Sequence, residues 1–496
     1  MNFRILAKIL GILITLIGLA MGVCALYAWI DLEFFAKTGD PDEHSAIRAL
    51  LIGLAISVGC GGTLAAIGWG GGREIMRREA IVIVGLGWIL AAVFGAIPYL
   101  FCDPGLSVVH AIFESTSGIT TTGSTIMTDI ESFPNGILLW RSFTQWLGGI
   151  GILVLFVAVL SFLGVGSRSL MQHESSLNIS DSGVSRIRDI AAVLVRIYLA
   201  LTIVCALGLG FLGMPPFEAI CHAMTTVATG GFSPKNASIG HYDNIAIEMW
   251  ISVFMLLGGI SFMLYVFIAQ RKTKRVKSEE EAKFYLILLL CACLAIGLDL
   301  LLVKDDMSYG QAIHETFFNV ISISTTTGYA VGDYDQWPLF SRMMLIVLMV
   351  IGGCAGSTAG GVKMNRIILF LKIARQELIQ LYRPNQVFRT TLNGVAPDKT
   401  VFVTTSLFLA LSFIIVLFAG LLVALFESEL ELLSVFGSVF ATLFNTGPGF
   451  DAVGPTDNFA FLHPYTLILL SLLMVIGRLE IFAILVLFLP SLWRRY

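Results

Sequence analysis

Ten stretches of this sequence are apolar and long enough to cross a bilayer as helices, which constrains the fold more than any other feature. A spanning helix needs roughly 20 apolar residues to cross about 30 Å of hydrocarbon. Because 56% of the 496 residues are hydrophobic and only 13% are charged, the composition excludes a soluble globular domain. We therefore predict an all-α polytopic membrane protein. The predicted spans are 4–30, 46–70, 80–102, 136–165, 191–213, 247–270, 284–303, 338–373, 400–426 and 464–492.

The placement of Lys and Arg predicts the orientation, because cytoplasmic loops carry an excess of these residues. If the N-terminus is cytoplasmic, the inner segments hold 23 of the 31 Lys and Arg residues, so both termini are expected inside. One inner segment, RKTKRVKSEEEAK at 271–283, has two interpretations. It is either an anchor to anionic headgroups and a topology signal, or a docking surface for a cytoplasmic partner.

Four further apolar segments are too short to span a membrane: about 107–119, 215–227, 311–324 and 432–443. Each is followed by a Thr-Gly step, and the four glycines are 107, 98 and 119 residues apart. The steps are Thr122-Gly123, Thr229-Gly230, Thr327-Gly328 and Thr446-Gly447. A regular period of this kind indicates an internal repeat. Each repeat is predicted to contain a spanning helix, a short pore helix, an extended Thr-Gly loop and a second spanning helix.

Since each repeat holds two spans, all four repeats start on the same side of the membrane and are parallel. Parallel repeats fit a central pore lined by four equivalent loops, with two extra N-terminal helices outside it. Non-helical backbone inside a membrane must be satisfied by protein or by a water-filled cavity. Loop carbonyls and threonine hydroxyls around an axis offer neutral, hard oxygens that suit an alkali cation. The alternative is four polar hairpins that only reconnect helices.

The second spans of the repeats also match one another, at 147–150, 257–260, 351–354 and 476–479. Arg478 stands where the other three repeats have Gly149, Gly259 and Gly353. A charge at mid-membrane costs about 2.5 to 3.5 kcal/mol, so we expect Arg478 to be functional and to face the axis. The alternative is a structural ion pair with Glu480, although residues two apart point to different helix faces. Glu480 is assigned no role in the pore.

The second span of the third repeat contains GGCAGSTAGG at 352–361, which is too rich in glycine for a stable helix. We expect the helix to break there and leave a loop inside the membrane. Arg478 carries five donors that suit the free carbonyls of such a loop. The hypothesis is that the loop and Arg478 form a constriction below the four Thr-Gly loops, and that the loop moves to open it. The alternative is that the glycines only allow close helix packing.

Other chemistry finds little support in the sequence. GLGFLG at 208–213 lies in a predicted span with no strand before it, and no phosphate-binding loop is present, so this chain is not expected to bind a nucleotide. The eight cysteines and the histidines lack metal-ligand spacing, and no nucleic-acid partner is expected. A membrane enzyme would have to use Glu114, Glu218 or Glu315 beside the pore helices. Acids near the outer mouth of a pore also attract cations without catalysis, so we predict a protein that is not an enzyme.

The motifs TTTGST, TTVATGGFS, STTTGYA, NTGPGF, GGCAGSTAGG and IGR resemble those of the TrkH/TrkG family of bacterial potassium uptake proteins. The resemblance covers essentially the whole chain, and the superfamily includes KtrB. It implies potassium uptake across the inner membrane, a homodimer with one pore per subunit, and cytoplasmic nucleotide-binding regulatory subunits of the TrkA type. A serine at the first filter glycine is associated with sodium preference in this superfamily, and here Gly123 is present. The alternative is a sodium-permeable or weakly selective relative.

The resemblance also implies site residues and repeat boundaries. The potassium filter maps to 121–124, 228–231, 326–329 and 445–448. Its potassium-binding residues are Thr121, Thr122, Gly123, Ala228, Thr229, Gly230, Thr326, Thr327, Gly328, Asn445, Thr446 and Gly447. The gate maps to Gly352, Gly353, Gly356, Ser357, Thr358, Gly360, Gly361 and Arg478. The expected divisions are an N-terminal helix pair at 1–75 and pore repeats at 76–170, 185–272, 280–380 and 396–496. Asn445 stands where the first and third filters have threonine.

Overall fold

The structure is a computed structural model that describes residues 1–34, 42–70, 76–163, 183–304, 307–386, 390–393, 396–397 and 399–493. These residues form helices and connecting loops with no β-strand, apart from one isolated bridge between Ile351 and Val362. Most of the predicted inner segment 164–190, the boundary between the first two repeats and the arginines at 494 and 495 lie outside the described residues. The repeat boundaries therefore remain predictions.

The helices follow the predicted order. The N-terminal pair consists of α1 (Phe3–Phe34) and α2 (Glu43–Ile67). The first unit contains α3 (Arg77–Gly95), α4 (Ile97–Phe101), α5 (Val108–Ile119), η1 (Ile130–Ser132) and α6 (Asn135–Leu163). The second contains α8 (Gly183–Phe211), α9 (Pro216–Val227), η2 (Ser238–Tyr242), α10 (Ile245–Gly259), α11 (Phe262–Ala269) and α12 (Thr273–Ser278). The third contains α13 (Glu281–Val303), α14 (Tyr309–Ser324), η3 (Tyr334–Gln336), α15 (Leu339–Val350) and α16 (Met364–Tyr382). The fourth contains α17 (Lys399–Phe426), α18 (Leu432–Leu443), η4 (Asp451–Val453), α19 (Pro464–Arg478), α20 (Phe482–Leu485), η5 (Val486–Phe488) and α21 (Pro490–Trp493).

Local sequence sets where the short helices begin. Ser107 caps α5 by accepting the N–H of His110, and Ser308 caps α14 by accepting the N–H of Gln311. Such caps satisfy one of the free N–H groups of a helix start. Pro216 occupies the first turn of α9, where its missing N–H is no loss. The short helices therefore start at fixed points and deliver the following loops to equivalent places.

The four units are packed in a closed cycle. The second helix of each unit contacts the short helix of the next unit: α6 with α9, α10 with α14, and α15 with α18. The cycle closes because α19 of the fourth unit packs against α5 of the first. This arrangement places the four short helices in the interior and gives the molecule one pseudo-fourfold axis.

Seven helices within the described residues are long and apolar enough to span a membrane. The predicted spans 247–270 and 464–492 are wrong as straight helices, because α10 and α11 meet at 89° and α19 is bent by 113° from the segment after it. The second bend follows from Glu480 and Ile481, whose φ angles of 56° and 62° end the helix. The predicted interruption of the third unit, between α15 and α16, lies at the glycine-rich stretch.

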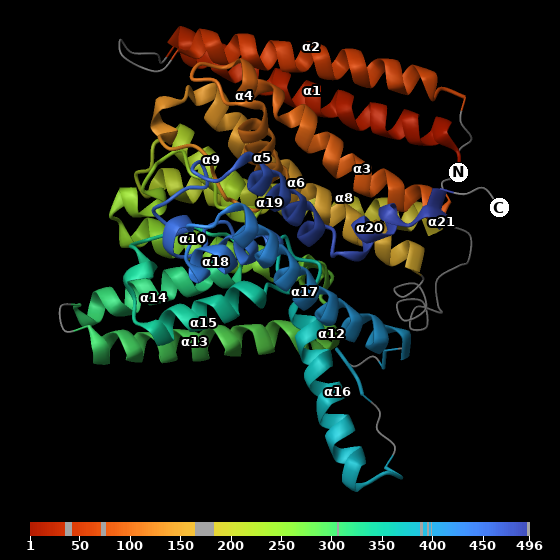
Figure 1. Ribbon diagram of the computed structural model, residues 1–496, viewed down its shortest axis with the longest axis vertical. Helices are drawn as coiled ribbons and strands as arrows, with labels where there is room; N and C mark the ends of the chain where they lie inside the picture. The colour runs from red at the N-terminus through yellow and green to blue at the C-terminus, as the bar shows by residue number, and fades with distance from the viewer. Residues whose placement is uncertain are drawn as a thin grey trace.

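The N-terminal pair lies along one edge of the molecule, where α1 and α2 pack side by side (Figure 1). The pair contacts the first unit through α3, α4 and α6. At the opposite edge, α16 projects away from the other helices (Figure 1). Most contacts of the N-terminal pair are with the first unit, although Tyr27 stacks on Phe217 of α9 and Leu6 clusters with Leu492 of α21. The pair does not enter the cycle.

Candidate ion-conducting site

Each of the four short helices is followed by a residue in the left-handed backbone region. These residues are Thr121, Thr229, Thr326 and Asn445, with φ angles of 52°, 52°, 55° and 54°. A glycine with positive φ follows two positions later in each loop: Gly123, Gly231, Gly328 and Gly447. The left-handed conformation costs roughly 1 to 2 kcal/mol for a residue with a side chain, and β-branched threonine rarely adopts it. Backbone strain that recurs in this way is typical of ligand-binding sites.

Hydrogen bonds fix the register of the loops. The N–H groups of Thr122, Gly230, Thr327 and Thr446 donate to carbonyls five residues earlier, those of Ser117, Thr225, Ser322 and Ala441. Gly230 is therefore equivalent to Thr122, and Gly231 is equivalent to Gly123. The prediction that paired Gly230 with Gly123 and placed the second loop at 228–231 is wrong by one residue. The equivalent stretch is 229–232, and Ala228 is the C-cap of α9.

A side chain from another helix takes the place of the missing threonine in the second loop. Gln145 of α6 is fully buried, and its Cδ lies 2.4 Å from the position of a Cβ on Gly230. Its Nε2 donates to the Gly230 carbonyl at 2.6 Å, and its Oε1 accepts the N–H of Phe232 at 3.0 Å. Position 230 therefore requires glycine because Gln145 occupies the space that a side chain there would need. Position 231 requires glycine for another reason, which is its positive φ and its contact with the next loop.

The four positive-φ glycines close a ring. A Cβ on each of them would lie within 3.0 Å of a carbonyl oxygen of the next loop, a distance that real Cβ atoms essentially never show. The pairs are Gly123 with the Gly230 oxygen (2.4 Å), Gly231 with Thr327 (1.8 Å), Gly328 with Thr446 (2.1 Å) and Gly447 with Thr122 (2.8 Å). Each contact joins a glycine to the residue before the equivalent glycine of the next loop. Glycine is therefore required at all four positions to keep the carbonyls together.

Asn445 lies where the fourth loop meets the first. Its Nδ2 donates to Thr122 Oγ1 at 2.8 Å and to the carbonyl of Met474 at 2.9 Å. Asparagine also tolerates the left-handed region better than most residues. Local contacts thus explain the departure from threonine, and they make this junction chemically different from the other three.

A buried ion pair supports the first loop from behind. Glu114 of α5 and Arg141 of α6 are 0% and 3% exposed, and Arg141 Nε lies 2.6 Å from Glu114 Oε1. Glu114 also accepts the N–H of Ile126 at 3.0 Å, while Arg141 Nη1 donates to the carbonyl of Ser233 at 2.8 Å. The interpretation of Glu114 as an acid at the outer mouth that attracts ions is wrong, because its charge is enclosed and paired.

The position of Glu114 is occupied by a polar residue on α9 and on α14 as well. In both helices its side chain contacts a residue that follows the positive-φ glycine of the loop. His222 Nε2 lies 3.0 Å from Ser233 Oγ. Asn319 Nδ2 donates to the carbonyl of Val331 at 2.8 Å. Both residues stand nine positions before the positive-φ glycine of their loop, as Glu114 does. In three of the four loops, a polar side chain of the short helix thus forms a hydrogen bond that fixes the chain after the positive-φ glycine.

Residues 351–363 form a non-helical loop between α15 and α16, called the intramembrane loop below. The Gly352 N–H donates to the Val362 carbonyl at 3.0 Å and so closes the base of this loop. The loop extends to the inner side of the ring. Its contacts there are Gly360 N–H to Thr326 Oγ1 (2.6 Å), Gly361 N–H to the Phe444 carbonyl (2.8 Å) and Thr358 Oγ1 to the Val227 carbonyl (3.0 Å). The loop thus contacts the residues that enter the second, third and fourth pore loops.

Arg478 meets this intramembrane loop from the end of α19. Its Nη1 donates to the Thr358 carbonyl at 2.8 Å, its Nη2 lies 3.5 Å from the Gly148 carbonyl oxygen, and the residue is 3% exposed. Glu480, by contrast, is placed against Arg366, with 2.5 Å between the carboxylate and Nη2. Arg478 therefore joins the third and fourth units to the first, below the ring.

Glycines of the second helices pack against the same part of three pore loops. A Cβ on Gly148, Gly258 or Gly477 would lie 2.1, 3.2 or 1.8 Å from the carbonyl oxygen of Ile119, Val227 or Leu443. These three carbonyls each stand four residues before the positive-φ glycine of their loop. In the third unit Gly352 instead lies against the Gly360 carbonyl of the intramembrane loop. The predicted alignment of the second helices thus holds in space for three units, and the loop replaces the helix in the remaining one.

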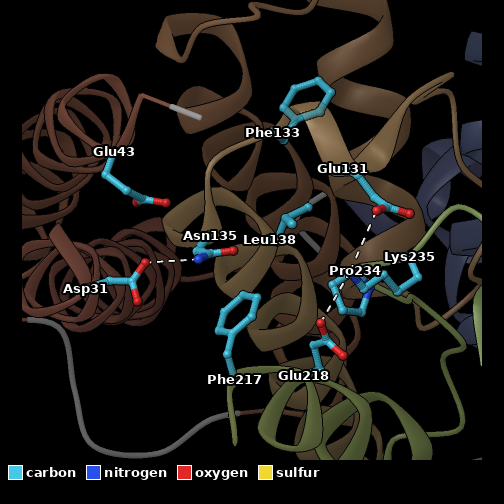
Figure 2. Close-up of a pocket in the computed structure, with 10 residues that line it drawn as sticks. All are labelled: Asp31, Glu43, Glu131, Phe133, Asn135, Leu138, Phe217, Glu218, Pro234 and Lys235. Carbon is cyan, nitrogen blue, oxygen red and sulfur yellow. Dashed lines mark hydrogen bonds and ion pairs between the residues drawn. The ribbon is translucent and has the colours of Figure 1, made fainter. Parts of the chain in front are cut away.

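A pocket of about 190 Å³ lies apart from the ring, where α1, α2 and α6 meet the chain after the second pore loop (Figure 2). Its acids are engaged by protein partners. Asp31 accepts Asn135 Nδ2 at 2.9 Å, Glu43 accepts the N–H of Gly136 at 3.1 Å, and Lys235 lies 3.3 Å from Glu218. Hydrogen bonds in the wall of this pocket therefore hold the N-terminal pair against α6. Glu218 is only partly buried there, and Glu315 accepts Gln311 Nε2 at 2.7 Å elsewhere on the surface.

The supporting residues His222, Asn319, Arg141 and Gln145 were missed from the sequence, and a pattern was available for Arg141 and Gln145. Both are polar, stand four residues apart within an apolar span, and are buried in the structure. Polar side chains four apart share one face of a helix, and polar residues inside membranes usually face protein. This spacing was the signal that could have found them.

The closed cycle and its central ring define a polytopic membrane protein with four quasi-equivalent pore units. The TrkH family, described as cation transport proteins, matches residues 51–495, and the chain belongs to this family. It is 36% identical over 502 residues to the Trk system potassium uptake protein TrkH of Escherichia coli K12, with both chains fully covered. It is 33% identical over 427 residues to TrkG of that strain, covering 85% of this chain and 87% of TrkG. The crystal structure of the potassium transporter TrkH from Vibrio parahaemolyticus matches with a TM-score of 0.88 at 33% identity over both whole chains. The family is one of transporters, which removes the alternative of a membrane enzyme.

Proposed function

We propose that this protein takes up potassium across the inner membrane through the ring of four Thr-Gly loops. The observation that carries the proposal is the repeated contact of each filter glycine with a carbonyl of the next loop. Such contacts bring four backbone carbonyls to one axis, where they can replace the hydration shell of a cation. The relatives named as potassium uptake proteins support the choice of ion.

The proposed filter contains Thr121, Thr122 and Gly123 with their equivalents in the other loops, which are 229–231, 326–328 and 445–447. Its oxygens are neutral and hard, as an alkali cation prefers. Glycine at all four key positions favours potassium over the alternative of a sodium-permeable or weakly selective transporter. Asn445 makes the filter chemically asymmetric, so strict fourfold coordination is not part of the proposal.

The proposed gate consists of the intramembrane loop and Arg478. In support, the Arg478 side chain donates to the Thr358 carbonyl directly below residues that enter the pore loops. A buried guanidinium in the path of a cation opposes its passage electrostatically. Movement of the loop away from the axis, with loss of the Arg478 contact, would open the path.

We also propose that the protein works as a homodimer in a bacterial inner membrane with both termini cytoplasmic. Leu6 of α1 and Leu492 of α21 pack in one cluster, which supports termini on the same side. The names of the relatives refer to a Trk system, which supports a nucleotide-binding partner of the TrkA type. Nucleotide binding is assigned to that partner and not to this chain.

Flux of cations into proteoliposomes tests the proposal. The purified protein is reconstituted with its regulatory partner, and uptake of potassium, rubidium and sodium is compared in vesicles of the same composition. Potassium and rubidium uptake well above that of sodium is the expected result. Equal uptake of the three ions would favour the weakly selective alternative, and the absence of any protein-dependent uptake would overturn the function.

A further inference from the structure

Three consecutive acids, residues 279–281, join the basic helix α12 to α13, and each of them holds a different part of the cytoplasmic end of the third unit. This stretch belongs to the segment 271–283 whose sequence allowed either a lipid anchor or a docking surface. Neither interpretation gives these acids a role inside the protein. Their contacts in the structure do.

Glu281 binds the backbone of the intramembrane loop. It is 3% exposed, and its Oε1 accepts the N–H of Ala355 at 2.6 Å and the N–H of Asn365 at 3.0 Å. Ala355 lies in the middle of the loop, whereas Asn365 lies in the first turn of α16. One carboxylate oxygen therefore ties the loop to the helix that follows it.

The start of α16 depends on this contact because its own sequence supplies no cap. Lys363 is the N-cap residue and its side chain makes no capping hydrogen bond, and the first turn of α16 contains no acid. The free N–H groups and the positive end of the dipole at a helix start favour a carboxylate. Glu281 provides it from another helix. A carboxylate that accepts N–H donors forms charge-assisted hydrogen bonds, which are about twice as strong as neutral ones.

The two preceding acids attach the same linker to the body of α16 and to the chain after it. Glu280 Oε2 lies 2.5 Å from Lys372 Nζ, and its N–H donates to Asn393 Oδ1 at 2.8 Å. Glu279 Oε1 accepts Asn393 Nδ2 at 3.0 Å. The linker thus contacts the loop, the body of α16 and the chain after α16, so a displacement of α12 pulls on all three.

We propose that Glu281 is a positioning residue that holds the intramembrane loop closed, and that residues 279–281 connect movement of the cytoplasmic helix α12 to this loop. The inference rests on the proposed gate. Loss of the Glu281 carboxylate removes one of the contacts that hold the Ala355 half of the loop, which keeps the backbone hydrogen bonds of Cys354 with Gly259 and of Gly356 with Phe262 nearby. Arg478 still binds Thr358 on the other half. The loop then leaves its closed position more often, without any change at the filter.

The native cysteine Cys354 reports on this movement directly. It precedes Ala355, is fully buried, and its N–H donates to the Gly259 carbonyl at 2.8 Å. Release of the loop therefore exposes its thiol to a small alkylating reagent. Labelling of the protein after denaturation in detergent serves as the reference for reagent activity. Cys24 and Cys205 are buried elsewhere and report on global unfolding.

The experiment measures N-ethylmaleimide labelling of each cysteine by peptide mass spectrometry, in the full-length protein in proteoliposomes. Glu281→Ala is compared with wild type, with the conservative Glu281→Gln and with Glu79→Ala. Glu79 is the matched control, because its carboxylate is also 3% exposed and also accepts two backbone N–H groups, those of Met76 and Asn2, far from the loop. Basal cation flux is measured on the same vesicles.

Glu281→Ala is expected to raise Cys354 labelling and basal flux at least tenfold, with Cys24 and Cys205 still protected. Glu281→Gln, which keeps an acceptor oxygen without its charge, is expected to give an intermediate increase, and Glu79→Ala no increase. Cys354 labelling and flux at wild-type values in Glu281→Ala would overturn the inference. If Glu281→Ala exposes Cys24 and Cys205, the variant has unfolded and Glu281→Gln takes its place. Cys354 labelling and flux above wild type in Glu281→Gln then support the inference, and wild-type values overturn it. A wild-type protein that carries no cation flux with its partner contradicts the proposed function instead, whatever the labelling shows.

Discussion

Replacing Gly231 with alanine tests the register of the second pore loop. Two consecutive glycines stand in this loop, and only the structure distinguishes their roles. Gly231 has a φ of 78°, and a Cβ on it would lie 1.8 Å from the carbonyl oxygen of Thr327. Gly230 has no such carbonyl beside it and instead faces the side chain of Gln145.

The magnitude follows from the geometry. To reach the shortest acceptable separation of 3.0 Å, the Thr327 oxygen must retreat by about 1.2 Å from its 1.8 Å position. The left-handed φ adds roughly 1 to 2 kcal/mol of backbone strain, which lowers stability. The change in selectivity comes from the displaced Thr327 oxygen, which no longer coordinates the cation as before. Each 1.4 kcal/mol corresponds to about a factor of ten in an equilibrium constant. We therefore expect Gly231→Ala to lower the potassium-to-sodium permeability ratio at least tenfold.

A double variant supplies the matched control. Gly230→Thr with Gln145→Ala gives the second loop the threonine that the other three loops have at this position and removes the side chain that would collide with it. The Phe232 N–H loses its acceptor and the Gly230 carbonyl loses the Gln145 Nε2 donor, and each loss costs about 1 to 3 kcal/mol of stability. The Thr327 carbonyl stays in place and only the support of the Gly230 carbonyl is lost, so the permeability ratio is expected to fall less than in Gly231→Ala.

Reversal potentials or competing rubidium and sodium uptake in proteoliposomes measure both variants. Under the alignment read from the sequence, Gly230 is the filter glycine, and the double variant is the one that loses selectivity. A selective Gly231→Ala protein beside an unselective double variant would refute the register and the ring built on it.

Three further perturbations test other parts of the site. Arg478→Ala removes a charge-assisted hydrogen bond to the Thr358 carbonyl, which is worth about 1.5 to 3 kcal/mol. Basal flux without the activating partner should therefore rise roughly 10- to 100-fold. Flux at the wild-type value from a folded variant would count against the proposed gate. Glu114→Gln leaves Arg141 buried without its counter-charge, which costs about 3 to 5 kcal/mol, and the thermal midpoint should fall clearly, unlike that of the surface variant Glu315→Gln; equal midpoints would show that the ion pair contributes nothing. Burial, with the nearby carboxylates of Asp333 and Asp451 opposed by Arg342, raises the pKa of Asp335 to about 6. Because a raised carboxyl pKa stabilises the folded state at low pH and this stability is lost as pH rises through about 6, the midpoint of wild type should fall between pH 5 and pH 7 by more than that of Asp335→Asn. Parallel pH profiles of the two proteins would exclude this contribution.

Much of the architecture could be predicted because it depends on composition over long stretches. Apolar length identified the spanning segments, and the four Thr-Gly steps identified the repeat, which the packing of α19 against α5 closes into a cycle. The glycine-rich stretch after Val350 predicted the break in the third unit, since glycine is a poor helix former wherever it is placed.

The details that the sequence did not predict depend on contacts between distant residues. The sequence alone does not distinguish Gly230 from Gly231 as the glycine that contacts the next loop. The contact of Gly230 with Gln145, 85 residues away in the sequence, distinguishes them in the structure. The bend after Arg478 rests on two left-handed residues, Glu480 and Ile481, whose composition gives no warning of it. Glu114 was interpreted by its charge alone, and the buried partner Arg141 reverses its meaning.

Anomalous scattering from rubidium tests the central claim most directly, namely that the four loops form one cation-binding ring in the register described. In crystals of the protein grown with rubidium in place of potassium, anomalous difference density is expected on the pseudo-fourfold axis. The density should be enclosed by the carbonyls of Thr122, Gly230, Thr327 and Thr446. Density confined to the acidic pocket beside the N-terminal helices, or no density at the ring, would contradict the account.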